Sequence, residues 1–146
     1  MRISSGDRRG KSFPVDLSDI HVLIVDDNED ALDIFSAALE RSGANVLKAR
    51  SARDALTILT AVRVDLLVSD LAMPGEDGLW LIRQVRRLKS EHGGSIPALA
   101  VTAYQDDYSV EQATTDGFQA FLPKPVDPFD LCRTVEALIG RGRGVT

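Results

Sequence analysis

The length, composition and charge of this chain point to one soluble globular domain: 146 residues, 44% of them hydrophobic and 27% charged, argue against a fibrous, disordered or multidomain protein. A formal net charge of -5 argues against non-specific binding to nucleic acid or to an anionic membrane, because the average field repels a polyanion. With the single cysteine Cys132, no signal peptide and no apolar run of roughly 18 residues, we expect a cytoplasmic protein without an internal disulfide.

Both ends of the chain are predicted to lie outside the domain. Residues 1–19 are mostly polar and are interrupted by glycine and proline, which is typical of a tail or linker. Residues 141–146 continue a run of alternating glycine and arginine, which is typical of a frayed terminus. The domain itself is therefore expected to span residues 20–140.

The predicted elements alternate from the start of that span. An apolar run over residues 21–25 predicts a strand, and an apolar stripe at helical spacing then predicts a helix that ends before Gly43. A second strand is predicted over residues 45–49. Ser51, with Asp54 three residues later, resembles a capping box that begins the second helix.

The second half of the domain repeats this alternation. Further strands are predicted over residues 64–68, 98–101 and 119–122, with helical stripes between and after them. The fourth helix is weakly patterned and is expected to end near Gly117, whereas the fifth is expected to begin at Pro128. The first, third and fourth strands show little alternation, which is typical of central strands covered on both faces.

Some side chains are assigned structural roles. Cys132 is expected to be a small buried hydrophobe. The basic residues of the third helix are expected to form its solvated face: Arg83, Arg86, Arg87 and Lys89.

Five strand–helix units in alternation predict an α/β fold with a parallel sheet and helices on both faces. The flavodoxin-like strand order 2-1-3-4-5, in a three-layer sandwich with five helices, is the natural arrangement for five such units. Ligands of such folds bind beyond the carboxyl ends of the first and third strands, where the strand order reverses.

Three carboxylates are placed at that position. Asp26 and Asp27 follow the first strand, and Asp70 follows the third. Like charges a few ångströms apart repel by roughly 1–4 kcal/mol per pair, so the cluster requires raised pKa values or a bound cation. Carboxylate oxygens that leave coordination positions open for water and phosphate suit Mg²⁺. Any one of these aspartates alone would be read as an ordinary solvated loop residue.

Two further groups are predicted at the same edge. Thr102 follows the fourth strand and supplies a hydroxyl, and Lys124 follows the fifth and supplies an ammonium. Phosphoryl transfer consists mostly of positioning and of neutralising charge on the phosphoryl oxygens, which a metal, a lysine and a hydroxyl do together. The carboxylate of Asp70 is then a plausible nucleophile that forms an acyl phosphate.

These motifs resemble the receiver domains of bacterial two-component response regulators, the CheY-like domains. The matching segments are Val-Asp-Asp-Asn at 25–28, Ser-Asp-Leu-Ala-Met-Pro-Gly-Glu-Asp-Gly at 69–78, Val-Thr-Ala at 101–103 and Lys-Pro at 124–125. The resemblance covers residues 20–139. It implies that Asp70 accepts a phosphoryl group from a phosphohistidine on a sensor histidine kinase or a histidine phosphotransfer protein.

The resemblance also implies roles for the neighbouring residues. Asp26, Asp27 and Asp70 would hold Mg²⁺ together with the backbone carbonyl of Ala72. Thr102 and Lys124 would bind phosphoryl oxygens, and Phe121 would move inward with Thr102 when the domain is activated. The peptide bond between Lys124 and Pro125, a structural residue, is expected to be cis.

Two positions are expected to modulate hydrolysis of the acyl phosphate. Ala72 lies two residues after the acceptor and offers no side chain to orient an attacking water. Tyr104 lies two residues after Thr102 and would shield the phosphoryl group. The hypothesis is slow self-dephosphorylation.

The resemblance further implies a signalling domain rather than an enzyme, which promotes only its own phosphorylation and dephosphorylation. With only a short tail after residue 139, we expect a lone receiver whose output is a changed protein contact, without nucleic acid or membrane partners. In the family the downstream partner usually binds the face formed by helix four, strand five and helix five. Whether phosphorylation drives formation of a homodimer stays open.

Other functions remain as alternatives. The chain is also consistent with the receiver segment of a hybrid histidine kinase or with a phosphorelay intermediate, since residues 15–20 resemble linkers that precede such segments. A phosphatase of the haloacid dehalogenase type also uses an aspartate and Mg²⁺, but it requires a second aspartate two residues after the first, where this chain has Asn28 after Asp26. A degenerate receiver that only binds partners would not need the intact acidic set, Thr102 and Lys124.

Overall fold

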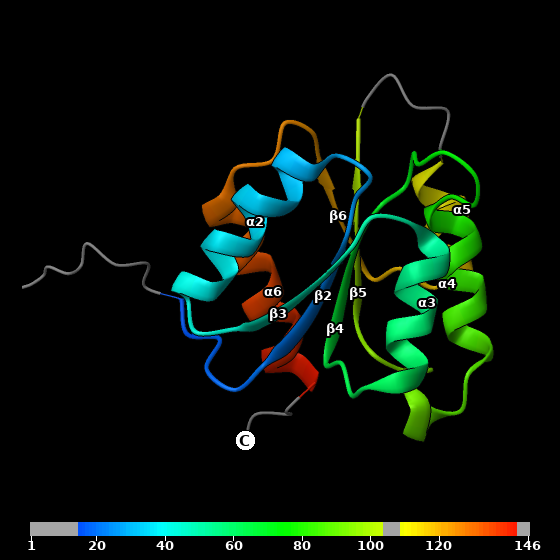
Figure 1. Cartoon of the computed structure of the whole chain (residues 1–146), viewed down its shortest axis with the longest axis horizontal. Coiled ribbons are helices and arrows are strands. Elements are labelled where there is room, and N and C mark those ends of the chain that lie inside the picture. Colours follow the sequence, from blue (N-terminus) through cyan, green and yellow to red (C-terminus); the bar gives the residue numbers. More distant parts are fainter. Residues whose placement is uncertain (1–14, 104–108, 143–146) are drawn as a thin grey trace, which may run out of the picture.

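A five-stranded parallel sheet forms the middle layer of the molecule, with helices on both faces (Figure 1). The computed structural model describes residues 15–103 and 109–142. The strands are β2 His21–Val25, β3 Asn45–Ala49, β4 Leu66–Asp70, β5 Ala98–Thr102 and β6 Ala120–Pro123. Their order in the sheet is β3-β2-β4-β5-β6, which confirms the predicted 2-1-3-4-5 arrangement.

The helices form the outer layers. They are α2 Glu29–Arg41, α3 Ala52–Ala61, α4 Gly78–Arg87, α5 Val110–Asp116 and α6 Pro128–Gly142, with a short 3₁₀ helix η1 at Ser90–His92. Helices α2 and α6 cover one face of the sheet, and α3, α4 and α5 cover the other (Figure 1). Within the described ranges, no helix combines the length and the apolar character that crossing a bilayer requires.

Local sequence signals explain where the helices begin. The side chains of Asn28, Ser51, Asp77 and Ser109 each accept a hydrogen bond from the backbone N–H three residues later. Such a cap satisfies an N–H that has no partner within the helix, and its removal costs about 1 kcal/mol. The predicted start at Ser51 is thereby confirmed. Gly43 follows the end of α2 with a φ of 104°, a conformation that favours glycine.

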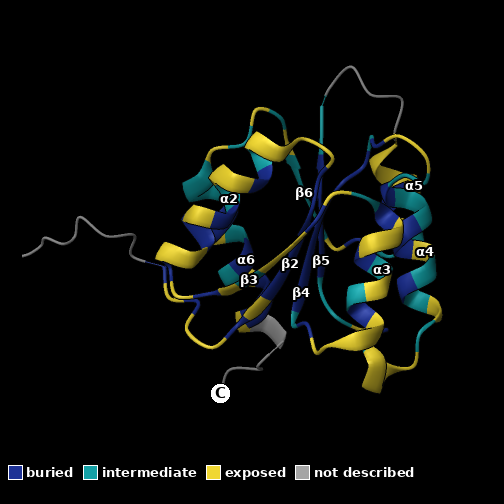
Figure 2. Ribbon diagram, in the orientation of Figure 1, coloured by how far each residue is buried: buried dark blue, intermediate teal, exposed yellow. Residues whose placement is uncertain are grey.

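The core consists of two apolar clusters, one on each side of the sheet (Figure 2). Strands β2, β4 and β5 contribute side chains to both clusters, which confirms that they are central strands covered on both faces. Cys132 lies fully buried in the cluster between the sheet, α2 and α6, as expected. Strand β4 begins two residues later than the apolar run suggested, and Asp70 is its last residue.

The structure corrects the predicted start of the domain. The side chains of Val15 and Leu17 are buried in the core, so the packed region already includes Val15 rather than beginning at residue 20. The Leu17 N–H donates to the Ser42 carbonyl at 2.7 Å, and the Asp16 N–H donates to Glu136 Oε2 at 3.1 Å. Two isolated apolar residues in a polar segment show no periodicity, and their burial depends on distant parts of the chain.

The structure also corrects the expectation for the basic residues of α4. Arg83 and Arg87 are exposed, but the Arg86 side chain is half-buried. Lys89 is also exposed, but it lies after the end of α4 at Arg87. Arg86 lies four residues after the buried Ile82 and therefore shares its face of the helix. Four basic residues within seven positions were expected to form one solvated face, but charge alone does not reveal which helical positions point inward.

Candidate functional site

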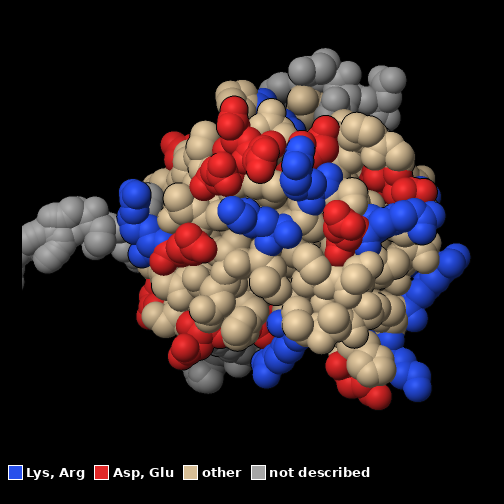
Figure 3. Space-filling model, viewed as in Figure 1, with Lys and Arg blue, Asp and Glu red and all other residues tan. Residues whose placement is uncertain are grey.

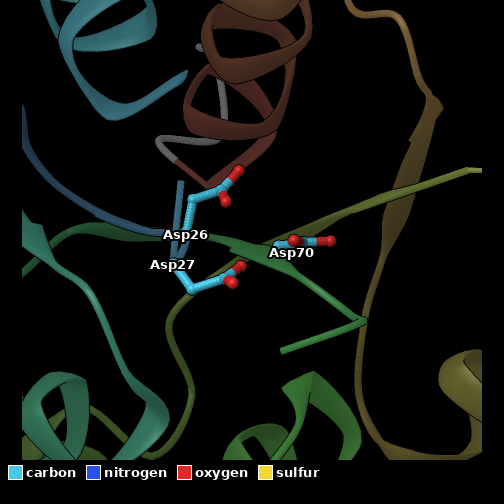
Figure 4. A group of neighbouring side chains, drawn as sticks. All are labelled: Asp26, Asp27 and Asp70. Atoms are coloured by element: carbon cyan, nitrogen blue, oxygen red, sulfur yellow. The ribbon is translucent and has the colours of Figure 1, made fainter. Parts of the chain in front are cut away.

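Three carboxylates meet beyond the carboxyl ends of β2 and β4. These strands pair in parallel with Val25 opposite Ser69, so Asp26 and Asp70 occupy neighbouring positions at the edge of the sheet. One oxygen from each of Asp26, Asp27 and Asp70 lies within 4.8 Å of the others. Figure 4 shows the three side chains projecting to the same side of the two strand ends. The predicted juxtaposition is confirmed.

Backbone N–H groups hold two of these carboxylates in place. Asp26 Oδ1 accepts a hydrogen bond from the N–H of Asn28 at 2.9 Å, and Asp70 Oδ1 accepts one from the N–H of Ala72 at 3.3 Å. The side chains of Asp26 and Asp70 are buried, whereas Asp27 is exposed. The site therefore combines two fixed, desolvated carboxylates with one at the solvent boundary.

Burial dominates the electrostatics of the pocket. It raises the pKa of Asp70 to about 6, with the Asp26 charge adding to the rise and the Lys124 ammonium opposing it. Burial also raises the pKa of Asp26, against the lowering effects of the Asn28 N–H and of Lys124. Charged carboxylates are thus unfavourable here without a counter-ion, so the pocket favours either protons or a cation.

The donor set fits a hard divalent cation. All the side-chain donors are carboxylate oxygens from Asp26, Asp27 and Asp70, which is the chemistry that Mg²⁺ prefers, and one side of the site is open to solvent through Asp27. Ala72 lies at the site through its N–H bond to Asp70. The part that its carbonyl plays in holding the metal stays a prediction.

The groups predicted to bind phosphate come from β5 and from the residue after β6. Lys124 Nζ lies 3.1 Å from Asp70 Oδ2 and 3.8 Å from Asp26 Oδ2. Val101 pairs with Asp70, which places Thr102 one residue beyond the acceptor along the neighbouring strand. The Lys124 N–H donates to the Thr102 carbonyl at 2.8 Å, so the backbones of these two residues are joined directly.

Other predicted residues lie close to this edge. Phe121, in β6, is half-buried against the cluster under α4, and its ring centroid lies 6.4 Å from that of Phe118. The Lys124–Pro125 peptide bond is cis, as expected. Tyr104 lies outside the described residues, so its shielding role stays a prediction.

Gly78 lies against the backbone of the Asp70 segment, a contact that the sequence analysis did not single out. A Cβ atom on Gly78 would lie 2.5 Å from the Asp70 carbonyl oxygen and 2.8 Å from the Leu71 Cα, and the Gly78 N–H donates to the Leu71 carbonyl at 2.9 Å. Helix α4 can therefore begin against the backbone of the acceptor only without a side chain at this position. The Asp77–Gly78 pair, a cap followed by glycine, was the available signal.

The surface above the site carries charge of both signs. Acidic and basic side chains gather together at the upper edge of the face shown in Figure 3, above the carboxyl ends of the strands. Two exposed ion pairs belong to this region: Arg50 lies 4.0 Å from Glu29, and Arg53 lies 3.1 Å from Glu76. Solvent screens such pairs, so each contributes little to stability.

Comparisons with known proteins agree with this geometry. The family model described as response regulator receiver domain matches residues 22–136. An uncharacterized 14.6 kDa protein of Leptolyngbya boryana is 42% identical over 120 residues, which cover 82% of this chain and 90% of that protein. The match to the putative two-component response regulator ARR21 of Arabidopsis thaliana, at 32% identity, spans only 20% of that longer protein.

Solved structures show the same fold. A putative response regulator from Chloroflexus aurantiacus superposes with a TM-score of 0.77 at 29% identity, covering 84% of this chain and 98% of that one. The receiver domain of a signal transduction histidine kinase from Syntrophus aciditrophicus gives a TM-score of 0.76 at 28% identity, covering 86% and 93%. The haloacid dehalogenase alternative is set aside on this basis. The chain belongs to the response regulator receiver domain family, with the flavodoxin-like fold of CheY-like domains.

Proposed function

We propose that this receiver domain accepts a phosphoryl group on Asp70 from a phosphohistidine of a sensor histidine kinase or a histidine phosphotransfer protein. The observation that carries the proposal is the convergence of Asp26, Asp27 and Asp70 within 4.8 Å, with Lys124 Nζ 3.1 Å from Asp70. A buried carboxylate with a cation beside it and a solvent-facing carboxylate at its mouth suits transfer of an anionic group.

The proposed chemistry is a displacement at phosphorus. A carboxylate oxygen of Asp70 forms a bond to phosphorus, the P–N bond of the phosphohistidine breaks, and the leaving imidazole keeps the electron pair and takes up a proton. Mg²⁺ held by Asp26, Asp27, Asp70 and the Ala72 carbonyl would supply neutralising charge for the phosphoryl oxygens. Lys124 would move from its carboxylate partners to a phosphoryl oxygen, and Thr102 would donate its hydroxyl to another.

The proposed output is a changed protein contact. Thr102 and Phe121 lie on the adjacent strands β5 and β6, and α5 packs on one face of these strands. A shift of Thr102 toward the phosphoryl group would therefore alter the surface formed by α5, β6 and α6. We propose a signalling role in the cytoplasm in which the only chemistry is the domain's own phosphorylation and dephosphorylation. The upstream and downstream partners of the domain would both be proteins.

Labelling with a small phosphodonor tests the central chemistry. Incubation with acetyl phosphate and Mg²⁺, followed by intact-mass measurement, is expected to add one phosphoryl group to the wild type and none to Asp70→Asn. Asp33→Asn is the matched control, because Asp33 is an exposed carboxylate on α2 that pairs with the exposed Lys48. Equal labelling of the wild type and Asp70→Asn, or no labelling of a folded wild type with Mg²⁺, would refute the proposal.

A phosphorelay role is the second candidate. The structural similarity to a receiver domain of a histidine kinase from Syntrophus aciditrophicus supports it. A relay member is expected to pass the phosphoryl group from Asp70 to a histidine of a purified phosphotransfer protein faster than the group is hydrolysed. A terminal regulator is expected to lose it to water instead, and a radiolabel chase distinguishes the two.

A further inference from the structure

The guanidinium group of Arg86 lies among oxygen atoms from two connecting segments. Its Nη1 donates to the carbonyls of Gly94 at 2.9 Å and Ile96 at 2.7 Å. Its Nε and Nη2 donate to the carbonyl of Gly117 at 3.2 Å and 2.6 Å, and Nη2 also reaches Gln119 Oε1 at 3.3 Å. One side chain of α4 thereby joins segments that lie up to 33 residues away along the chain.

These acceptors lie at one end of the sheet. Gly94 and Ile96 precede β5, while Gly117 and Gln119 precede β6. Gly117 also ends α5. Gln119 extends the connection, because its Oε1 accepts a hydrogen bond from the Ala98 N–H at 2.7 Å and its own N–H donates to the Ala98 carbonyl at 2.9 Å. Arg86 therefore fastens the amino ends of β5 and β6, and the carboxyl end of α5, to α4.

Three further observations support a specific role for this arrangement. One turn earlier on α4, Arg83 Nε lies 2.9 Å from Asp116 Oδ2 in the last turn of α5. A Cβ atom on Gly117 would lie 2.7 Å from Arg86 Nε, so the guanidinium occupies the space that a side chain would need. Partial burial among these oxygens lowers the pKa of Arg86. A lysine has neither the planar fork nor the number of donors to replace it.

The opposite ends of the same two strands carry the groups that the proposed function assigns to phosphate binding. Thr102 is the last residue of β5, and Lys124 follows the last residue of β6. We infer that Arg86 is a positioning residue for the switch: it clamps the amino ends of β5 and β6, so that movement toward a phosphoryl group is confined to their carboxyl ends. This inference rests on the proposed function of Asp70.

Hydrogen exchange with and without phosphorylation tests the clamp. The proteins are the wild type, Arg86→Lys and the matched control Arg87→Lys, since Arg87 is an exposed neighbour on the same helix. In the wild type and the control, acetyl phosphate with Mg²⁺ is expected to change amide exchange near Thr102 and Lys124. The exchange rates of the hydrogen-bonded amides of Gly117, Phe118 and Gln119 should change by less than about twofold on phosphorylation.

In Arg86→Lys, phosphorylation is expected to change exchange at residues 117–119 by about tenfold, because the movement is no longer confined. A merely structural role would instead raise exchange there equally in both states. The inference is overturned if phosphorylation changes residues 117–119 of the wild type as strongly as Thr102, or if Arg86→Lys responds like Arg87→Lys. If Arg86→Lys does not fold, the change in hydrogen exchange of the wild type on phosphorylation alone decides whether the inference holds. The intact mass of the same samples measures phosphorylation of Asp70. If the wild type is not phosphorylated, the proposed function is overturned, and the inference is overturned with it.

Discussion

Lys124 Nζ lies 3.1 Å from Asp70 Oδ2 in a pocket where the Asp70 side chain is only 3% exposed. The lysine comes from the residue after β6 and the aspartate from the end of β4, which are separated by β5 in the sheet. The ammonium partly compensates a carboxylate that burial would otherwise strongly destabilise.

The first prediction concerns Lys124 itself. Lys124→Met keeps the apolar stem but leaves the buried Asp70 charge without its partner. We expect the free energy of unfolding near pH 7.5, measured by urea titration in EDTA, to fall by about 1–2 kcal/mol. The loss should be smaller than for a fully buried pair, because 34% of the Lys124 side chain is exposed and solvent screens the interaction. An unchanged midpoint and slope would contradict the pairing.

The second prediction is a pH dependence caused by Asp70. Its pKa in the folded state is raised to about 6, so the folded protein binds a proton more tightly than the unfolded chain. The stability that this proton confers is present at about pH 4 and is lost as the pH rises through about 6. In EDTA, Asp70→Asn should therefore be more stable than the wild type near pH 7.5, by on the order of 2 kcal/mol, with the difference disappearing at about pH 4.

Denaturant titrations of both proteins across this pH range provide the measurement. Asp33→Asn is the control, since an exposed carboxylate should produce a much smaller effect. The prediction would be contradicted if the stability of the wild type relative to Asp70→Asn increased as the pH rises.

The third prediction concerns the metal. If Mg²⁺ binds with a dissociation constant of about 1 mM, then about 10 mM should stabilise the wild type by roughly 1.4 kcal/mol, because only the folded state gathers the three carboxylates. Asp26→Asn and Asp27→Asn should lose most of this gain. Thermal unfolding with and without Mg²⁺ measures it, and an equal gain in Asp27→Asn would remove that residue from the metal site.

The fourth prediction concerns Gly78. In Gly78→Ala the added methyl group meets the Asp70 carbonyl oxygen, so the start of α4 must move away from the acceptor. We expect a loss of about 1–3 kcal/mol in stability and at least about tenfold slower labelling by acetyl phosphate in the folded protein. Gly140→Ala is the matched control, because a Cβ at that helical position meets nothing within 4 Å and should be neutral or slightly stabilising. Equal labelling rates in the two variants would exclude a positioning role for Gly78.

The fifth prediction concerns the lifetime of the acyl phosphate. Because Ala72 offers no side chain to orient water, decay of phospho-Asp70 should last minutes or longer, and Ala72→Asn should accelerate it several-fold. Tyr104→Ala should also accelerate decay if the phenol shields the phosphoryl group. A lifetime of seconds in the wild type, unchanged by Tyr104→Ala, would refute the shielding hypothesis.

The fold and the location of the site could both be predicted from the amino-acid pattern. Apolar runs and capping residues such as Ser51 specify local structure through nearby atoms, so five alternating units followed directly from the pattern. Once the strand order was inferred, Asp26 and Asp70 had to meet, because parallel neighbouring strands end at the same edge.

Which side chains lose their water became visible only once the packed chain was known. Leu17 is buried by packing against α2 and α6, and Arg86 is half-buried among carbonyls that precede β5 and β6. The pKa of Asp70 likewise depends first on burial and then on Lys124, 54 residues away. Burial and electrostatics are properties of atoms brought together from distant parts of the chain, so no local pattern contains them.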